Sequence, residues 1–190
     1  MKQILAAAAM LGCALAFAAP DQPGLNRDYW TSAQHKGDRS AKSLVAKKIA
    51  PAGSDVQKTS EAKSWTKPEK GSNWADNYVQ RMYGYIVPDT TGNYVFYIAA
   101  DDSATLYLST DATPGKAKAI ARTSSWTNPK EFTKKPSQKS APVKLEKGKK
   151  YYVEAVMFEG AGGDNLAFAW VVPGKTAPEI IPTKNLKTAK

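Results

Sequence analysis

GNYVFYIAADDSATLYL, which runs from Gly92 to Leu108, is the stretch that decides the fold of this 190-residue chain. Both of its halves are rich in apolar and aromatic residues with the period-two pattern of β-strands. Its polar centre, Asp101-Asp102-Ser103, consists of residues that favour turns. The stretch therefore predicts two adjacent strands, Asn93 to Ala99 and Thr105 to Ser109, joined by a tight turn.

Similar strand patterns recur on both sides of this hairpin, separated by turn signals such as Pro88 to Gly92 and Gly160 to Asn165. Residues 20–76 are weakly patterned, and only Ser43 to Ile49 predicts a short helix. Many short strands without a long amphipathic helix indicate an all-β protein, an antiparallel β-sandwich or barrel with a loop-rich N-terminal part. The further predicted strands are Val79 to Val87, Ala117 to Ala121, Val143 to Leu145, Tyr151 to Phe158 and Leu166 to Val172.

The last of these strands has an unusual alternation of side-chain size. Leu166, Phe168 and Trp170 alternate with Ala167 and Ala169. The large residues predict a core-facing side, and the small residues allow another part of the chain to lie close against the opposite side. This strand is therefore expected to be packed on both faces.

The composition supports one domain with a substantial core, because 42% of the residues are hydrophobic. Lys and Arg number 27 against 17 Asp and Glu, a formal net charge of +10. This excess favours acidic partners and leaves nucleic acid, acidic glycans and membrane surfaces open. Lysines are densest between Lys134 and Lys150, where they form either a patch for acidic glycans or nucleic acid, or a solvated sheet face and turn.

The N-terminus predicts export. Residues 1–18 have a cationic start, an apolar run and the small residues of a signal-peptide cleavage site after Ala18. Cys13 leaves lipidation open as an alternative; with ordinary cleavage the mature chain has no cysteine for a disulfide, a metal-binding thiolate or a nucleophile. No later stretch is apolar enough to span a bilayer. We expect a periplasmic, surface or secreted location, which argues against nucleic acid as the partner.

The hairpin at residues 92–108 resembles the central hairpin of PA14 domains, the β-sandwich family named after anthrax protective antigen. Further segments resemble that family in the same order: Gly24 to Trp30, Arg81 to Val87, Lys149 to Glu154, Gly162 to Trp170, and Ile181 to Leu186 as the closing strand. The resemblance covers residues 24–187, which are expected to form one domain. It implies a carbohydrate-binding module, because fungal adhesins and some glycosidase-associated modules of this family bind sugars.

The resemblance also implies a calcium site. In the adhesins two consecutive Asp residues joined by a cis peptide hold a calcium ion that takes two sugar hydroxyls as ligands, and Asp101 and Asp102 match that pair. Asn165, or Asp164 beside it, stands where the family places an Asn that completes the ion's shell. These residue types supply the oxygens that calcium prefers. The alternative from the residues alone is an ordinary polar turn.

Loop tryptophans are candidates for stacking on a sugar ring. Trp65, Trp74 and Trp126 lie in polar, turn-rich segments, and Trp126 is the best candidate of the three. Its alternative role is to cover the end of the sandwich core. The expected carbohydrate-binding set is thus Asp101, Asp102, Trp126 and Asn165.

Catalysis has little support in the sequence. The only histidine, His35, is expected to be an ordinary surface residue. Adjacent carboxylates do not offer the separation across a scissile bond that glycoside hydrolysis requires. We therefore expect a non-catalytic protein that binds glycans, including acidic polysaccharides or glycoproteins. The alternative is an envelope or surface scaffold that contacts proteins and has no sugar site.

Overall fold

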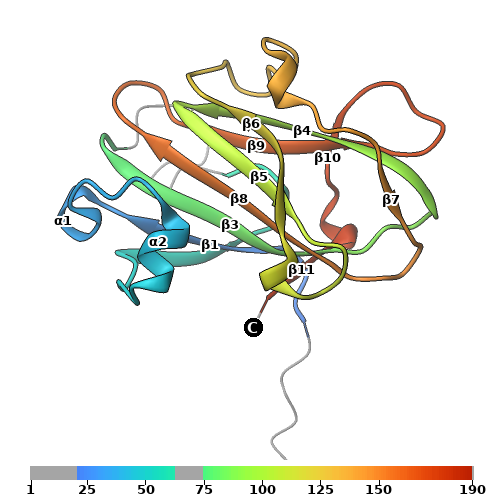
Figure 1. Cartoon of the computed structure of the whole chain (residues 1–190), viewed down its shortest axis with the longest axis horizontal. Helices are drawn as coiled ribbons and strands as arrows, with labels where there is room; N and C mark the ends of the chain where they lie inside the picture. Colours follow the sequence, from blue (N-terminus) through green and yellow to red (C-terminus); the bar gives the residue numbers. More distant parts are fainter. Residues whose placement is uncertain (1–20, 63–74, 190) are drawn as a thin grey trace, which may run out of the picture.

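The computed structural model describes residues 21–62 and 75–189. Residues 1–18, the expected signal peptide with Cys13, lie outside the described residues, as do Trp65 and Trp74. Two antiparallel sheets pack as the layers of a sandwich (Figure 1). Within the described residues, no helix is both long and apolar enough to cross a membrane.

The larger sheet has seven strands in the order β2-β1-β3-β8-β5-β6, with β11 also paired to β3. Its longest ladder joins β3 and β8, which pair from Tyr78 opposite Glu159 to Ile86 opposite Tyr151. The strands are β1 (Leu25–Trp30), β2 (Gly53–Gln57), β3 (Tyr78–Ile86), β5 (Ser103–Leu108), β6 (Lys118–Thr123), β8 (Tyr151–Glu159) and β11 (Leu186–Thr188).

The smaller sheet has four strands in the order β10-β9-β4-β7. They are β4 (Gly92–Asp101), β7 (Val143–Leu145), β9 (Asn165–Val171) and β10 (Glu179–Ile180). The two predicted strands are therefore confirmed as β4 and β5, but the predicted hairpin is wrong, because the strands belong to different sheets and do not pair. The turn between them bridges the two layers of the sandwich. Short 3-10 helices lie in the connections: η1 (Pro114–Lys116), η2 (Pro136–Gln138) and η3 (Thr183–Asn185).

The main core lies between the sheets. Alternate residues of β8, namely Tyr151, Val153, Ala155 and Met157, face large residues of the smaller sheet such as Phe96, Phe168 and Trp170. The small residues of β9 lie on the other side, where Ala167 and Ala169 pack with Tyr97 and Phe132. The prediction that β9 is packed on both faces is confirmed, and the covering segment is the connection between β6 and β7.

The N-terminal part is more ordered than the sequence pattern predicts. β1 is paired on both edges, to β2 and β3, although it contains Arg27 and Asp28. These buried charges are neutralised by ion pairs: Arg27 with Asp55 at 2.5 Å, and Asp28 with Arg81 at 2.8 Å. The charges interrupt the apolar alternation by which a strand is recognised in sequence, and their partners lie far away in the chain.

Three local expectations differ from the structure: the bounds of two elements are shifted, and one residue is buried instead of exposed. The helix predicted at Ser43 to Ile49 is α2 (Ala41–Ala46), which begins after its N-cap Ser40. The closing strand begins only at Leu186, because η3 occupies Thr183–Asn185.

His35 ends the short helix α1 (Ser32–His35) and is buried: its Nε2 lies 3.0 Å from the Asn77 carbonyl and its Nδ1 accepts from the Gly37 amide. Both ring nitrogens thus have main-chain partners, which explains why this polar side chain is buried.

Candidate functional site

The turn between β4 and β5 brings two carboxylates to one end of the sandwich. Asp101 is the last residue of β4, Asp102 follows it, and β5 begins at Ser103. The peptide bond between Asp101 and Asp102 is cis, as the resemblance implied. Asp101 lies directly opposite Asn165, the first residue of β9, in the ladder between these strands. The sheet itself therefore places Asn165 beside the Asp pair.

The side chain of Asn165 has a fixed orientation. Its Nδ2 donates a hydrogen bond of 2.9 Å to the main-chain carbonyl of Thr127. Its Oδ1 is buried and has no hydrogen-bond partner within the described residues. An amide oxygen that is buried without a partner is unfavourable, so Asn165 presents an oxygen that is suited to bind a cation.

Asp102 is oriented by the loop that follows β8. Its Oδ2 accepts a hydrogen bond of 3.0 Å from the amide of Gly160, and its own amide donates to the carbonyl of Phe158. The glycine is needed here because a Cβ at position 160 would lie 2.7 Å from Asp102 Oδ2. Gly163 in the same loop has more room: a Cβ there would lie 3.5 Å from Asp101 Oδ2.

A third carboxylate, which the sequence reasoning missed, belongs to Glu159. Among the described residues, Asp101, Asp102 and Glu159 each offer one carboxylate oxygen, and these oxygens lie within 4.8 Å of one another. Glu159 is fully buried. The sequence contains a signal for it, because Glu159 continues the core-facing alternation of β8 beyond Met157. A carboxylate in an apolar phase of a strand marks a special position, but the predicted strand stopped at Phe158.

Burial and mutual repulsion disfavour ionisation of this cluster. Burial, with the charge of Asp102 second, raises the pKa of Asp101 to about 6. Burial, with the charges of Asp164 and Asp102 next, raises the pKa of Glu159 to about 8. Asp164 is thus close enough to act on both groups, although it does not belong to the set of three converging carboxylates. Grouped carboxylates in such surroundings attract a cation.

The donor set fits calcium. Calcium prefers six to eight oxygen ligands from carboxylates, amide or main-chain carbonyls and water. Asp101, Asp102, Glu159 and the Oδ1 of Asn165 supply oxygens of these kinds. Two of these side chains, Glu159 and Asn165, have buried oxygens that find no hydrogen-bond partner among the described residues. In the part of the chain that the structure describes, the converging groups are all carboxylates, so a hard, oxygen-preferring cation is the best match to them.

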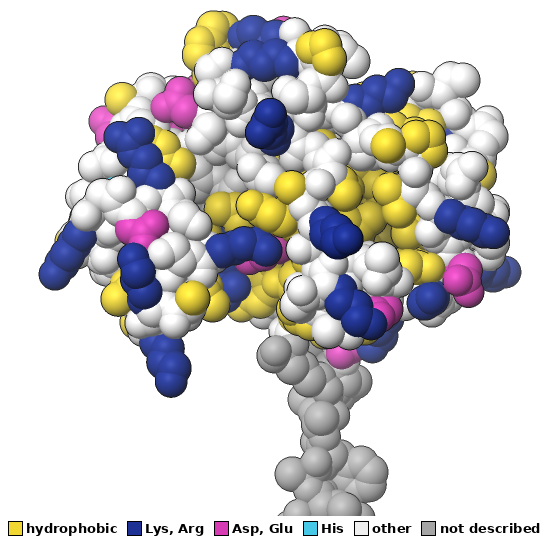
Figure 2. Space-filling view, viewed as in Figure 1, with side chains coloured by type: hydrophobic (Ala, Val, Ile, Leu, Met, Phe, Trp, Pro, Cys, Tyr) yellow, Lys and Arg dark blue, Asp and Glu magenta, His cyan; other side chains and the backbone are white. Residues whose placement is uncertain are grey.

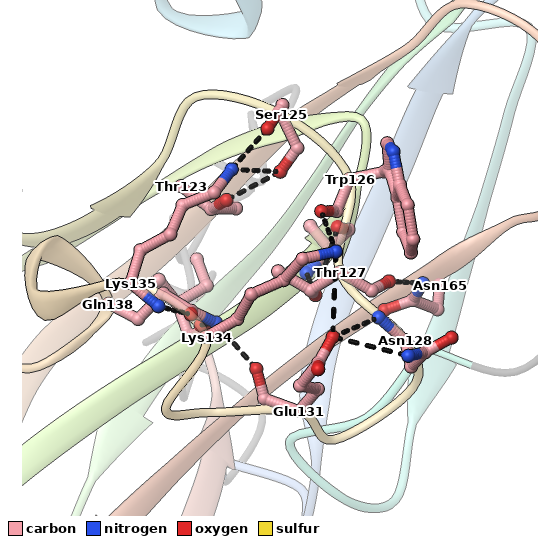
Figure 3. A network of polar contacts seen from close by, with 12 residues as sticks. Thr123, Ser125, Trp126, Thr127, Asn128, Glu131, Lys134, Lys135, Gln138 and Asn165 are labelled. Carbon is pink, nitrogen blue, oxygen red and sulfur yellow. Dashed lines mark hydrogen bonds and ion pairs between the residues drawn. The ribbon is translucent and has the colours of Figure 1, made fainter.

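Trp126 lies at the edge of this cluster, on the connection between β6 and β7. Its side chain is 51% exposed, so it does not cover the core, which was its alternative role. The Nζ of Lys134 lies 3.2 Å from the centre of its ring and donates to its main-chain carbonyl. Figure 3 shows that the neighbouring Thr127 links this segment to Asn165. The segment that carries Trp126 is therefore joined to Asn165 by one hydrogen bond.

The segment that carries Trp126 is held on the smaller sheet by hydrogen bonds. The buried side chain of Gln138 donates to the carbonyls of Ile98 and Glu131, and accepts from the amide of Lys135 (Figure 3). Thr127 exchanges main-chain and side-chain hydrogen bonds with Ala100. These bonds hold the segment on the smaller sheet immediately before Asp101.

The lysines between Lys134 and Lys150 do not form one surface. Lys134 contacts Trp126 and Glu131, whereas Lys150 lies at the start of β8 and pairs with Asp21. On the face shown in Figure 2, Lys and Arg side chains are spread over the surface and interrupted by apolar and acidic ones. The positive charge of the chain is therefore distributed, and the cluster of Asp101, Asp102 and Glu159 is a local exception to it.

Comparisons with known proteins identify the family to which this fold belongs. The model of the family described as PA14 domain matches residues 21–184. The chain belongs to the PA14 domain family. Solved PA14 domains share its fold. The sugar-binding PA14 domain of an RTX adhesin superposes with a TM-score of 0.61 at 16% identity, and the match covers 88% of this chain and 99% of that one.

A fungal relative by structure is the A domain of epithelial adhesin 6 from Candida glabrata, solved in complex with Galβ1-3GlcNAc. It superposes with a TM-score of 0.61 at 14% identity, covering 90% of this chain and 89% of that one. Among curated sequences, mouse N-acetyl-β-glucosaminyl-glycoprotein 4-β-N-acetylgalactosaminyltransferase 1 is 36% identical over 99 residues. That match covers 50% of this chain and only 10% of the mouse protein, so this PA14 domain corresponds to a small part of it.

Proposed function

We propose that the protein is an exported, non-catalytic glycan-binding module in which calcium helps to bind the sugar. The observation that carries the proposal is the pairing of Asp101 with Asn165 across the β4–β9 ladder, next to Asp102. Asp101, Asp102 and Asn165 would hold the ion, and the ion would supply coordination positions for two sugar hydroxyls. The sugar-binding PA14 neighbours support a glycan as the ligand.

The protein's own residues would orient the sugar. Trp126 presents a half-exposed ring at the edge of the site, and such a ring can stack on the apolar face of a pyranose. Because Lys134 covers one side of the ring at 3.2 Å, the other side remains for the sugar. Asn128 and Glu131, which are hydrogen-bonded to each other beside this ring, offer polar groups for further hydroxyls.

Isothermal titration calorimetry tests the proposal. The mature chain is titrated with a panel of neutral and acidic oligosaccharides that includes Galβ1-3GlcNAc, with calcium and then with EDTA. We expect binding that is lost in EDTA and restored by calcium. Binding that persists in EDTA would remove calcium from the proposal, and no binding across the panel would favour a scaffold that contacts proteins.

A further inference from the structure

Glu159 is the least compensated charged group at this end of the sandwich. It is fully buried, and neither of its carboxylate oxygens has a hydrogen-bond partner within the described residues. A carboxylate that is buried in this way is strongly unfavourable unless a positive charge or hydrogen-bond donors compensate it. Gly160, whose amide lies next to it in the chain, donates instead to Asp102.

The groups that act on Glu159 offer no compensation either. The charges that raise its pKa, besides its burial, belong to Asp164, Asp102, Asp76 and Asp101. Its partner across the ladder with β3 is the buried Tyr78. One carboxylate oxygen of Glu159 nevertheless lies within 4.8 Å of an oxygen of Asp101 and of Asp102. The side chain points toward the place where a cation would lie, and toward like charges.

The position of Glu159 in the fold adds a second argument. Asp101 and Asn165 belong to the smaller sheet, whereas Glu159 is the last residue of β8 in the larger sheet. Glu159 is thus the group through which the larger sheet contributes a strand residue to the cluster. An ion shared by these residues would connect the two layers at the end of the sandwich.

We propose that Glu159 is a third carboxylate ligand of the cation, so that calcium binds before the sugar and without it, and joins the two sheets. The inference rests on the calcium site of the proposed function and adds two properties to it. Calcium affinity does not depend on a glycan, and calcium stabilises the fold, because binding only to the folded state shifts the folding equilibrium.

The experiment uses the mature chain and calcium alone, without any glycan. Calcium affinity is measured by calorimetry, and the melting temperature is measured in EDTA and in calcium. We expect one bound calcium per chain and a higher melting temperature in calcium. In Glu159→Gln, calcium affinity should fall by about tenfold or more, the size of effect known for groups that support a metal site.

Asp76→Asn is the matched control. Asp76 is an exposed carboxylate whose charge acts on Glu159, but it lies outside the three converging groups. Its removal tests the loss of nearby negative charge without the loss of a ligand, and calcium affinity should fall by less than about threefold, as for a screened charge. Equal losses in the two variants would show that Glu159 acts only through its charge and would overturn the inference.

The remaining outcomes are also distinct. If Glu159→Gln binds calcium as tightly as the wild type, the inference fails while the proposed function stands. If the wild type binds calcium but no glycan, the proposed function fails while the inference stands, and if it binds no calcium, both fail. If Glu159→Gln does not fold, Glu159→Asp decides, because it keeps the charge and withdraws the carboxylate by one methylene: reduced calcium affinity supports the inference, and wild-type affinity overturns it.

Discussion

The side-chain amide of Asn165 donates a 2.9 Å hydrogen bond to the main-chain carbonyl of Thr127. This bond fixes the orientation of the side-chain amide, because the Nδ2 is engaged while the buried Oδ1 has no hydrogen-bond partner among the described residues. The first strand residue of β9 and the segment that carries Trp126 are therefore coupled. Substitutions of Asn165 and Thr127 should therefore affect different properties, namely cation binding in the first case and fold stability in the second.

Asn165→Ala is expected to abolish measurable calcium binding, because the variant lacks the Oδ1 that the hydrogen bond with Thr127 orients. Thr127→Val retains the main-chain carbonyl that orients Asn165 but removes the hydroxyl that accepts from the Ala100 amide. It should lower the free energy of unfolding by about 1–3 kcal/mol, the effect of leaving a buried donor unpaired. Calorimetry with calcium and urea unfolding in EDTA measure the two effects. Calcium affinity close to wild type in Asn165→Ala would remove this residue from the site.

The two glycines of the loop after β8 make a matched pair. A Cβ at Gly160 would lie 2.7 Å from Asp102 Oδ2, so Gly160→Ala should rotate that carboxylate away and reduce calcium affinity by about tenfold or more. Because the displaced group is the free end of a side chain, stability in EDTA should change little. Gly163→Ala introduces only an ordinary contact at 3.5 Å and should bind calcium like the wild type. Equal calcium affinities in the two variants would contradict the role of Asp102.

The site residues predicted from the sequence come from the resemblance to PA14 domains, which implies roles for Asp101, Asp102 and Asn165. The pattern of the residues alone fits an ordinary polar turn equally well, because Asp is favoured in turns. Glu159 was not predicted as a site residue because the apolar pattern of its strand ends at Phe158, one residue before it. β1 was not predicted from the pattern because Arg27 and Asp28 interrupt its apolar alternation. The ion-pair partners that allow these charges to be buried come near only in the folded chain. A period-two pattern indicates which apolar side chains are buried, but it cannot indicate that paired charges are buried as well.

Trp126 should contribute to glycan binding and little to folding. Trp126→Ala removes a ring that is 51% exposed, so the free energy of unfolding should change by about 0.5 kcal/mol or less. Glycan affinity should fall by about tenfold, because stacking on an aromatic ring is lost, and calcium affinity should stay the same. Trp126→Phe keeps an aromatic face and should bind the glycan with intermediate affinity. Calorimetry with a glycan that binds the wild type checks this, and unchanged affinity in Trp126→Ala would exclude stacking.

Gln138 anchors the segment that bears Trp126. Its side chain makes hydrogen bonds with Ile98, Glu131 and Lys135 at 2.7–2.8 Å and is fully buried. Gln138→Leu retains the volume but leaves these main-chain groups unpaired, which should cost about 3 kcal/mol of unfolding free energy. Urea unfolding measures the loss. Ser137→Ala, at an exposed neighbouring position, is the control and should unfold like the wild type.

The acidic cluster predicts an unusual pH dependence in EDTA. The pKa of Asp101 is raised from 3.8 to about 6 and that of Glu159 from 4.5 to about 8, so the folded chain binds more protons than the unfolded chain between these limits. Stability must then fall as pH rises through this window. Melting temperatures between about pH 5 and pH 8.5 should decline more steeply in the wild type than in Glu159→Gln. Parallel curves for the two proteins would contradict the raised pKa of Glu159.

Phe132 packs against Ala167 and Ala169 on the outer side of the smaller sheet, apart from the main core. The segment that presents Trp126 is thus attached through a small hydrophobic cluster of its own, whereas the carboxylates are held by the ends of β4 and β8. Thr127 is the link between these two parts, because its main-chain carbonyl accepts the hydrogen bond from Asn165. Substituting Ser125, Trp126 and positions 128–131, while Thr127, Phe132, Gln138 and the two alanines are kept, is therefore a practical route to test new sugar preferences on an unchanged scaffold.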